Sequence, residues 1–247
     1  VGLPIQACIF IGSSGIRKYA EDWTLDQMLD TIEEAVTFAL TEGLSVMMVT
    51  EDTTRTDPED IKAFYCRAIE LGAERLCLSD TVGHATPDGV RALVRFIIEE
   101  VVEPSGKEIG IDRHDGSQHP LTLHLPGRHN LSNALAAIEA GVTRVHATAL
   151  GLGERCGNTE MELLLVNLKL LGVHNANLSV LPEYCRLAAN MCQVPLVHSS
   201  PVVGRDAFRT GTGVHAAAIM KAAAKGDVWL ADRIYSSVPA SLVGREQ

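Results

Sequence analysis

The chain alternates between short apolar runs and longer runs with helical spacing, and this alternation restricts its fold more than any other feature. Five strand-then-helix pairs succeed one another at the interval of a βαβ unit. Such alternation predicts a parallel sheet with helical crossovers. The expected strands are residues 5–12, 45–50, 75–79, 108–112 and 144–150, and the expected helices are residues 25–41, 59–71, 88–101, 130–140 and 159–171.

The pattern changes after about residue 158, where it becomes almost entirely helical. Further helices are expected at residues 179–192, 213–225 and 227–234, with a Pro- and Gly-rich interruption at 195–206. We therefore expect two domains, a sheet-containing domain over residues 1–175 and a helical subdomain over residues 176–247.

Each expected strand ends in a polar turn, and the turns read GSSGIRKY, EDTTRTD, DTVGHATP, DRHDGSQH and GLGERCGN. Polar residues at the carboxyl ends of successive parallel strands are typical of an α/β barrel. A dinucleotide-binding fold would instead carry a G-x-G-x-x-G turn after its first strand, and this chain has none there. Because a closed barrel needs eight units, the predicted fold class is α/β, a partial TIM (β/α)8 barrel built from the last five βα units and followed by the helical subdomain. The alternative is a complete, open five-stranded sheet.

Composition excludes several classes of protein. Hydrophobic residues make up 46% of the 247 residues, which is enough to bury a core, and no apolar run is long enough to span a membrane. The net charge of −10 argues against nucleic-acid binding. The six cysteines occur singly, and the first residues lack the features of a signal peptide. We therefore expect reduced thiols in a cytoplasmic protein.

Five motifs that occur together in order carry a resemblance to a known family. The chain resembles the 2-isopropylmalate synthase and homocitrate synthase family, which is related to hydroxymethylglutaryl-CoA (HMG-CoA) lyase. The motifs are TEDTTRTDPED at 50–60, SDTVGHATPDG at 79–89, NALAAIEAG at 133–141, GLGERCGN at 151–158 and GTGVHAAAIMKA at 211–222.

The resemblance implies an acyltransferase that condenses acetyl-CoA with a 2-oxo acid, namely 2-oxoisovalerate to give 2-isopropylmalate in leucine biosynthesis. It also implies a divalent metal, Mg²⁺, Mn²⁺ or Zn²⁺, which polarises the ketone, and a base that deprotonates the acetyl methyl group. Family members are usually homodimers. The alternatives are a homocitrate or citramalate synthase, an HMG-CoA lyase-like enzyme, and a non-catalytic fragment that binds acyl-CoA or a partner subunit.

Six residues receive catalytic or substrate-binding roles by this resemblance. Glu51, His215 and Tyr235 are the expected catalytic residues. Thr81, Arg55 and Glu154 are the expected substrate-binding residues. Each has a simpler explanation: a capping hydroxyl for Thr81, a surface ion pair between Glu51 and Arg55, a pair with Arg155 within the turn for Glu154, and ordinary packing or exposure for His215 and Tyr235.

The expected metal ligands are His114, Asn158 and His124, of which His124 is a substitute. The family has a His-x-His pair after the seventh strand, but here the second position falls on Gly116, and the segment before Asn133 is longer than usual. An insertion or a sequence error explains this segment more simply than a new metal site does. Asn158 has the alternative role of a helix N-cap. Since the family's first strand, with its metal-binding Asp and its Arg, is not found in this sequence, we expect this polypeptide alone to be inactive.

Overall fold

The structure is a computed structural model that describes residues 5–83, 85–107, 109, 121–124, 131–154, 157–211, 213–234 and 236–245. The chain divides into two compact units. The first comprises Val1–Ala147 with Gly153–Thr159, and the second comprises Thr148–Leu152 with Glu160–Gln247. The helix Met161–Leu170, which the sequence-based boundary after residue 175 would assign to the sheet domain, lies in the second unit.

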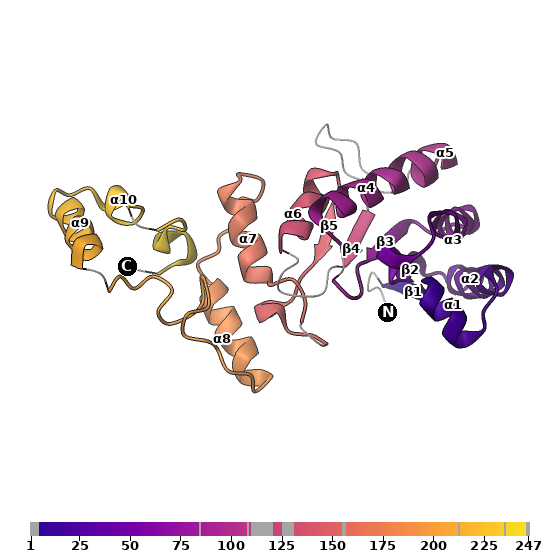
Figure 1. Cartoon of the computed structure of the whole chain (residues 1–247), viewed down its shortest axis with the longest axis horizontal. Helices are drawn as coiled ribbons and strands as arrows, with labels where there is room; N and C mark the ends of the chain where they lie inside the picture. The colour runs from indigo at the N-terminus through magenta and orange to yellow at the C-terminus, as the bar shows by residue number, and fades with distance from the viewer. Residues whose placement is uncertain are drawn as a thin grey trace. The chain divides into compact units, whose positions relative to one another are not determined.

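The first unit is built on a five-stranded parallel sheet in which the strands lie in the order of the chain (Figure 1). The sheet is open, with β1 at one edge and β5 at the other. Its strands are β1 (Gln6–Gly12), β2 (Ser45–Glu51), β3 (Arg75–Ser79), β4 (Leu121–His124) and β5 (Arg144–His146).

Helices follow the strands as the alternation of the sequence predicts. They are α1 (Gly15–Glu21), α2 (Leu25–Thr41), α3 (Pro58–Leu71), α4 (Pro87–Ile97), α5 (Glu103–Ser105) and α6 (Leu131–Glu139). A π-helical segment, Ile98–Val102, joins α4 to α5. Thr24 and Gln27 form a capping box that begins α2, and Pro58 starts α3 behind the N-cap Asp57. Local sequence therefore fixes where these two helices begin.

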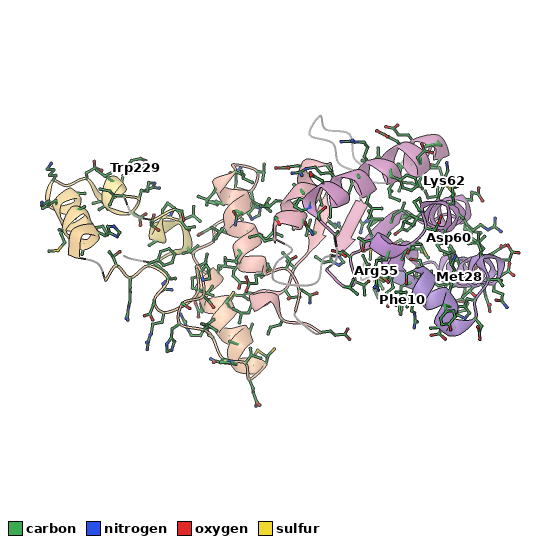
Figure 2. The ribbon with its side chains drawn as sticks, viewed as in Figure 1. Phe10, Met28, Arg55, Asp60, Lys62 and Trp229 are labelled. Carbon is green, nitrogen blue, oxygen red and sulfur yellow. The ribbon has the colours of Figure 1, made fainter. Side chains whose placement is uncertain are left out.

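The core of the first unit lies between the sheet and the helices α2 and α3. Alternate residues of β2, among them Met48, are buried, as are Leu76 to Ser79 of β3, and both helices contact β2. On α2, Met28 and Ile32 supply the apolar face, while Phe10 on β1 is 69% exposed (Figure 2). The two helices also pack against each other, as Figure 1 shows.

The fourth strand is not where the sequence placed it. β4 is Leu121–His124, whereas the expected strand 108–112 lies almost wholly outside the described residues, and Ile109 is buried without being part of a strand. The register Leu76↔Leu121 and Leu78↔Leu123 shows that LTLH matches the apolar residues of β3. His124 is therefore the last residue of β4.

The second unit is helical, apart from an isolated bridge between Thr148 and Glu160. Its elements are a 3₁₀ turn Ala149–Gly151, α7 (Met161–Leu170), α8 (Leu181–Met191), α9 (Gly213–Ala224), α10 (Val228–Ala231) and a 3₁₀ turn Ala240–Val243. A cluster that includes Val166, Cys185 and Val243 forms its core. Among the residues that the structure describes, no helix has the length and apolarity needed to cross a bilayer.

Candidate functional site

One row of residues crosses the carboxyl edge of the sheet. Gly12 lies opposite Glu51, Ser79 lies opposite His124, and His124 lies opposite His146. Glu51 and Ser79 fall in the same row, because they follow the paired residues Thr50 and Leu78. Chemically versatile residues from four strands therefore share the edge at which α/β folds place their active sites.

The turn after β2 is held by an ion pair within the turn itself. Asp52 has a positive φ of 65°, and its carboxylate is almost fully buried. Arg55 donates to it from Nε, over 2.8 Å to Oδ1, and from Nη2, over 2.5 Å to Oδ2. This hydrogen bonding raises the pKa of the Arg55 guanidinium, and Asp80 adds to the effect. About a third of the Arg55 side chain remains exposed.

The turn after β3 is tied to the turn after β2. The Asp52 N–H donates to the Thr81 hydroxyl oxygen over 2.7 Å. The Asp80 carboxylate accepts from the Thr54 hydroxyl over 2.8 Å and from the Ala85 N–H over 3.1 Å. Thr81, Asp52 and Arg55 are thus connected, so two of the predicted substrate-binding residues share one network.

A chain of buried hydroxyl groups supports these turns from below. The Ser79 N–H donates to Thr53 Oγ1 over 2.8 Å, and Tyr65 donates to the Cys77 carbonyl over 2.7 Å. Thr50 Oγ1 lies 2.6 Å from both Thr53 Oγ1 and the Tyr65 hydroxyl. Because the Tyr65 hydroxyl proton points to the Cys77 carbonyl, the Thr50 hydroxyl donates to the Tyr65 oxygen, whereas the Thr53 hydroxyl donates to the Thr50 carbonyl over 2.7 Å. These buried hydrogen bonds polarise and strengthen one another.

The turn after β1 joins the same edge through backbone contacts. Ser13 is fully buried, and it donates to the Glu51 carbonyl from both its N–H, over 3.1 Å, and its hydroxyl, over 2.9 Å. Its hydroxyl also lies 2.7 Å from that of Thr56. The Glu51 carbonyl is therefore held by two hydrogen bonds from Ser13, while the Glu51 side chain is half-buried at the end of β2.

Glu154 and Asn158 lie in the loop Gly153–Thr159, which belongs to the first unit. Asn158 packs directly over Gly153: a Cβ atom on Gly153 would lie only 2.1 Å from Asn158 Nδ2 and 3.0 Å from its Cγ. The position of the Asn158 amide therefore depends on the absence of a side chain at residue 153. Its predicted role as a helix N-cap is wrong, because α7 begins at Met161 behind Glu160.

The remaining predicted site residues lie in the second unit or have side chains outside the described residues. His215 lies in the first turn of α9, in the second unit. Tyr235 and His114 lie outside the described residues, as does His84, and for His124 only the backbone position at the end of β4 is described.

Asp52, Asp80, Ser13 and His146 belong to the edge, but the sequence analysis did not assign them a role. The Asp52–Arg55 spacing within EDTTR was an available signal, since residues three apart meet in a helical turn. His146 ends β5, and desolvation together with nearby Arg144 lowers its pKa. No sequence motif marks Ser13, because its contacts come from the pairing of β1 with β2.

A metal centre needs several ligands that converge, and the described residues do not supply one. Within the described ranges, no three His, Cys, Asp or Glu side chains are grouped so that they could hold an ion. Two expected ligand positions, His114 and the His124 side chain, lie outside that description. The divalent metal that the family resemblance implies therefore stays a prediction.

Known proteins resemble this chain over most of its length. A putative (R)-citramalate synthase of Methanothermobacter thermautotrophicus is 34% identical over 84% of the chain and 38% of its own length. A probable 2-isopropylmalate synthase of Methanopyrus kandleri is 31% identical over 87% and 41%, and a homocitrate synthase of M. thermautotrophicus is 30% identical over 86% and 51%. The chain thus spans about half the length of these curated relatives, or less.

The fold has solved counterparts. The crystal structure of hydroxymethylglutaryl-CoA lyase from Pseudomonas aeruginosa superposes with a TM-score of 0.61 at 17% identity, over 76% of this chain and 63% of that one. The fold of this chain therefore matches that of a TIM-barrel enzyme, although the sheet described here is open and only partial. The model of the HMGL-like family matches residues 5–187, which include the whole sheet and its connected turns. On this evidence the chain belongs to the HMGL-like family.

Proposed function

We propose that the protein carrying this chain is a 2-isopropylmalate synthase-like acyltransferase, which condenses acetyl-CoA with 2-oxoisovalerate. A homocitrate or citramalate synthase is the alternative, since relatives named for all three activities match the chain to a similar degree. The observation that carries the proposal is the hydrogen-bonded edge where Arg55 and Thr81 meet through Asp52.

The extent of the matches favours a synthase over a lyase. The family model ends at residue 187, whereas the relatives named as synthases cover 84% or more of the chain. Since residues 1–187 are only about three quarters of 247 residues, these matches include residues of the second unit that lie beyond residue 187. The lyase structure covers 76%. The relatives named as synthases thus match a part of the second unit that lies beyond the family model.

The edge of the sheet suits a reaction between two carbonyl compounds. The exposed part of the Arg55 guanidinium can bind the carboxylate of a 2-oxo acid, because a guanidinium matches a carboxylate in geometry and charge. Asp52 keeps Arg55 oriented, so little side-chain entropy is lost when substrate binds. Thr81 offers a hydroxyl beside it, and Glu51 is the proposed base for the acetyl methyl proton.

Members of the family typically depend on a metal and act on acyl-CoA. When bound, a divalent metal would polarise the ketone of the 2-oxo acid. We propose Asn158 and the histidines of the fourth strand region, His114 and His124, as its ligands, and His215 and Tyr235 as further acid–base groups from the second unit.

The test is thiol release from acetyl-CoA by the protein that contains these 247 residues. It is run in parallel with 2-oxoisovalerate, pyruvate and 2-oxoglutarate, and the product is identified by its mass. We expect release with 2-oxoisovalerate, together with an equal amount of the 2-hydroxy diacid. Preference for another of the three acids selects the alternative synthase. Cleavage of HMG-CoA without any condensation contradicts the proposal.

Arg55 provides the residue-level test. Arg55→Gln is expected to raise KM for the 2-oxo acid by about tenfold, the loss of one charge-assisted contact. Arg95→Gln removes the same charge from an exposed position on α4 and is expected to leave KM unchanged. Equal KM values for the two variants would exclude Arg55 from substrate binding.

A further inference from the structure

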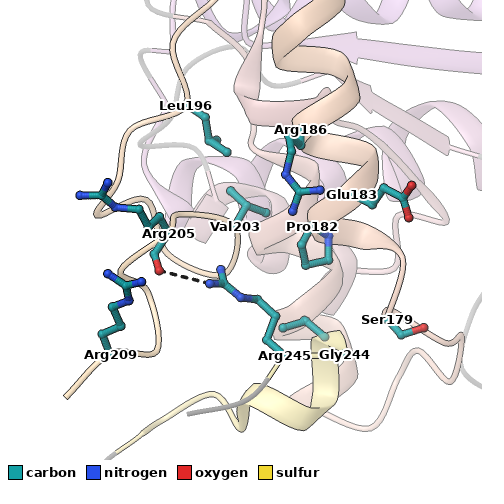
Figure 3. A pocket seen from close by; sticks show the side chains of 11 residues that line it. Ser179, Pro182, Glu183, Arg186, Leu196, Val203, Arg205, Arg209, Gly244 and Arg245 are labelled. Carbon is teal, nitrogen blue, oxygen red and sulfur yellow. Dashed lines mark hydrogen bonds between the residues drawn. The ribbon is translucent and has the colours of Figure 1, made fainter.

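A pocket that contains none of the residues assigned to the proposed condensation lies entirely within the second unit. It encloses about 510 Å³, which is within the range of small-molecule binding sites. The start of α8, the loop before α9 and the last described residues form its walls (Figure 3). Its lining residues are Ser179, Pro182, Glu183, Arg186, Leu196, Val203, Arg205, Arg209, Val243, Gly244 and Arg245.

The lining is strongly basic in a chain whose net charge is −10. The lining contains four arginines and a single carboxylate, that of Glu183. In Figure 3, Arg186 extends from α8 toward Val203 and Pro182, whereas Glu183 points away on the other side of the helix. The positive charge is therefore concentrated on the side of the pocket that Arg186 occupies.

Fixed contacts hold Arg245 in place. It donates from Nη1 to the Gly204 carbonyl over 2.5 Å and from Nη2 to the Arg205 carbonyl over 3.2 Å. Its guanidinium also lies over the ring of Phe208, 5.4 Å from the centroid. Gly204 has no room for a side chain, since a Cβ atom there would lie 2.4 Å from the His198 carbonyl oxygen. This wall is thus built before any ligand arrives.

The other arginines are only partly neutralised. Arg205 and Arg209 share the single carboxylate of Asp206, at 3.3 Å and 3.1 Å, and all three side chains are largely exposed. No hydrogen bond or ion pair to another described residue is found for Arg186. Exposed ion pairs of this kind are weak, so these guanidinium groups can exchange partners for a stronger anion.

We propose that this pocket binds a phosphorylated ligand that carries at least two negative charges, a diphosphate or a phosphate monoester with an attached apolar group. Guanidinium groups bind phosphate oxygens in pairs, and the N-terminal end of α8 adds a favourable field. Pro182, Leu196, Val203 and Val243 supply an apolar wall for the remainder of the ligand. The proposal does not depend on the condensation reaction.

The chemistry fits two sources, the 3′-phospho-ADP end of coenzyme A and a free nucleotide or pyrophosphate. Titration calorimetry of the 247-residue chain with inorganic pyrophosphate, ADP, coenzyme A and 3′-dephospho-coenzyme A distinguishes them. We expect saturable pyrophosphate binding with Kd below about 1 mM that weakens as salt is added. Tighter binding of coenzyme A that is lost with the dephospho form identifies coenzyme A as the source. Equal binding of all four identifies a general diphosphate site.

Arg186→Gln is expected to weaken pyrophosphate binding by about tenfold, and Arg209→Gln to weaken it by less, because Arg209 is already paired with Asp206. Arg95→Gln in the first unit is the matched control and should have no effect. Circular dichroism verifies that each variant is folded. If Arg186→Gln does not fold, the pyrophosphate affinity of Arg209→Gln and the salt dependence of binding test the proposal instead. Absence of pyrophosphate binding, or equal weakening by Arg186→Gln and Arg95→Gln, overturns the proposal.

Discussion

The backbone N–H of Asp52 donates a 2.7 Å hydrogen bond to the hydroxyl oxygen of Thr81, a residue that follows the neighbouring strand. Asp52 reaches this position only because its φ is 65°, a conformation that Asp tolerates better than most residues do. The same backbone geometry directs its carboxylate to Arg55. A single strained residue thus links the turns after β2 and β3 and orients the cation between them.

Thr81→Val tests this link. Removal of the hydroxyl leaves the Asp52 N–H without its acceptor in a residue that is 2% exposed, which is expected to cost about 1–3 kcal/mol of unfolding free energy. Thr81→Ser keeps the hydroxyl and should retain most of the stability. Urea denaturation measures both, and identical curves for the two variants would show that the contact contributes nothing.

Tyr65→Phe tests the hydroxyl chain below the edge. Tyr65 is fully buried, and loss of its hydroxyl removes one hydrogen bond to the Cys77 carbonyl and one to the Thr50 hydroxyl. We expect a loss of about 1–3 kcal/mol in unfolding free energy. Tyr19→Phe is the matched control, since Tyr19 is 86% exposed and should tolerate the change. A Tyr65→Phe variant as stable as the control would exclude a structural role for these buried hydroxyl groups.

The parts of this fold that sequence could predict are those that local signals determine. The predicted and observed bounds of α2 coincide, because the capping box at Thr24 and the left-handed Gly43 define its ends. By contrast, α1 lies largely within GSSGIRKY, a segment that was expected to be a polar turn. Its Lys18 pairs with Asp60 on α3, a contact between residues far apart in the chain. The sequence of α1 alone did not reveal that contact.

The candidate site shows the same difference between features that local sequence determines and features that depend on distant residues. Thr81 and Arg55 became candidates through the family resemblance, which rests on polar motifs that follow two expected strands and are visible in a sequence. The role of Asp52 depends on a positive φ and on the register of β2 with β3, and neither can be read from residue order. The strand that ends at His124 was missed because two short runs, 108–112 and 121–124, have similar apolar patterns, and only pairing with β3 distinguishes them.

Gly153→Ala should displace Asn158 without unfolding the protein. The new Cβ would lie 2.1 Å from Asn158 Nδ2, so the amide has to move, whereas the loop around residue 153 is exposed. We expect kcat/KM for condensation to fall on the order of tenfold or more, with a small change in thermal stability. Gly15→Ala is the control, because a Cβ atom there contacts nothing within 4 Å. Unchanged activity in Gly153→Ala would remove Asn158 from the proposed site.

Glu162 gives the second unit a predictable pH dependence. It is 2% exposed and accepts a 2.9 Å hydrogen bond from the Leu150 N–H, and burial raises the pKa of its carboxyl group above the usual 4.5. The folded protein holds this proton more tightly than the unfolded chain does. The stabilisation is therefore complete below the unfolded pKa and is lost as the pH rises through the folded pKa.

Glu162→Gln keeps an acceptor for Leu150 but has no charge to bury, so its unfolding free energy should at least equal that of the wild type at pH 7. The difference in unfolding free energy between Glu162→Gln and the wild type should become smaller as the pH falls toward 4.5. Urea denaturation across this range measures it, with the exposed Glu183→Gln as a control that shows no such trend. A Glu162→Gln variant that is less stable at every pH would show that the ionised carboxylate is the stabilising form.

Thiol reactivity should follow burial. Cys77 and Cys185 are buried, and desolvation raises the pKa of each thiol to about 12, whereas Cys192 is exposed. Because the thiolate is the reactive species, iodoacetamide at pH 8 should label Cys192 well before either buried residue. Peptide mass spectrometry over a time course gives the order. Rapid labelling of Cys185 in folded protein would contradict the packing of the second unit.

The strands of the sheet lie side by side in the order in which they are synthesised. A nascent chain can therefore pair each new strand with the one just completed, without waiting for a distant segment to leave the ribosome. Assembly of this kind keeps the separation between pairing segments to a single βα step, which favours rapid folding and limits the time for which an unpaired strand edge is exposed to other chains.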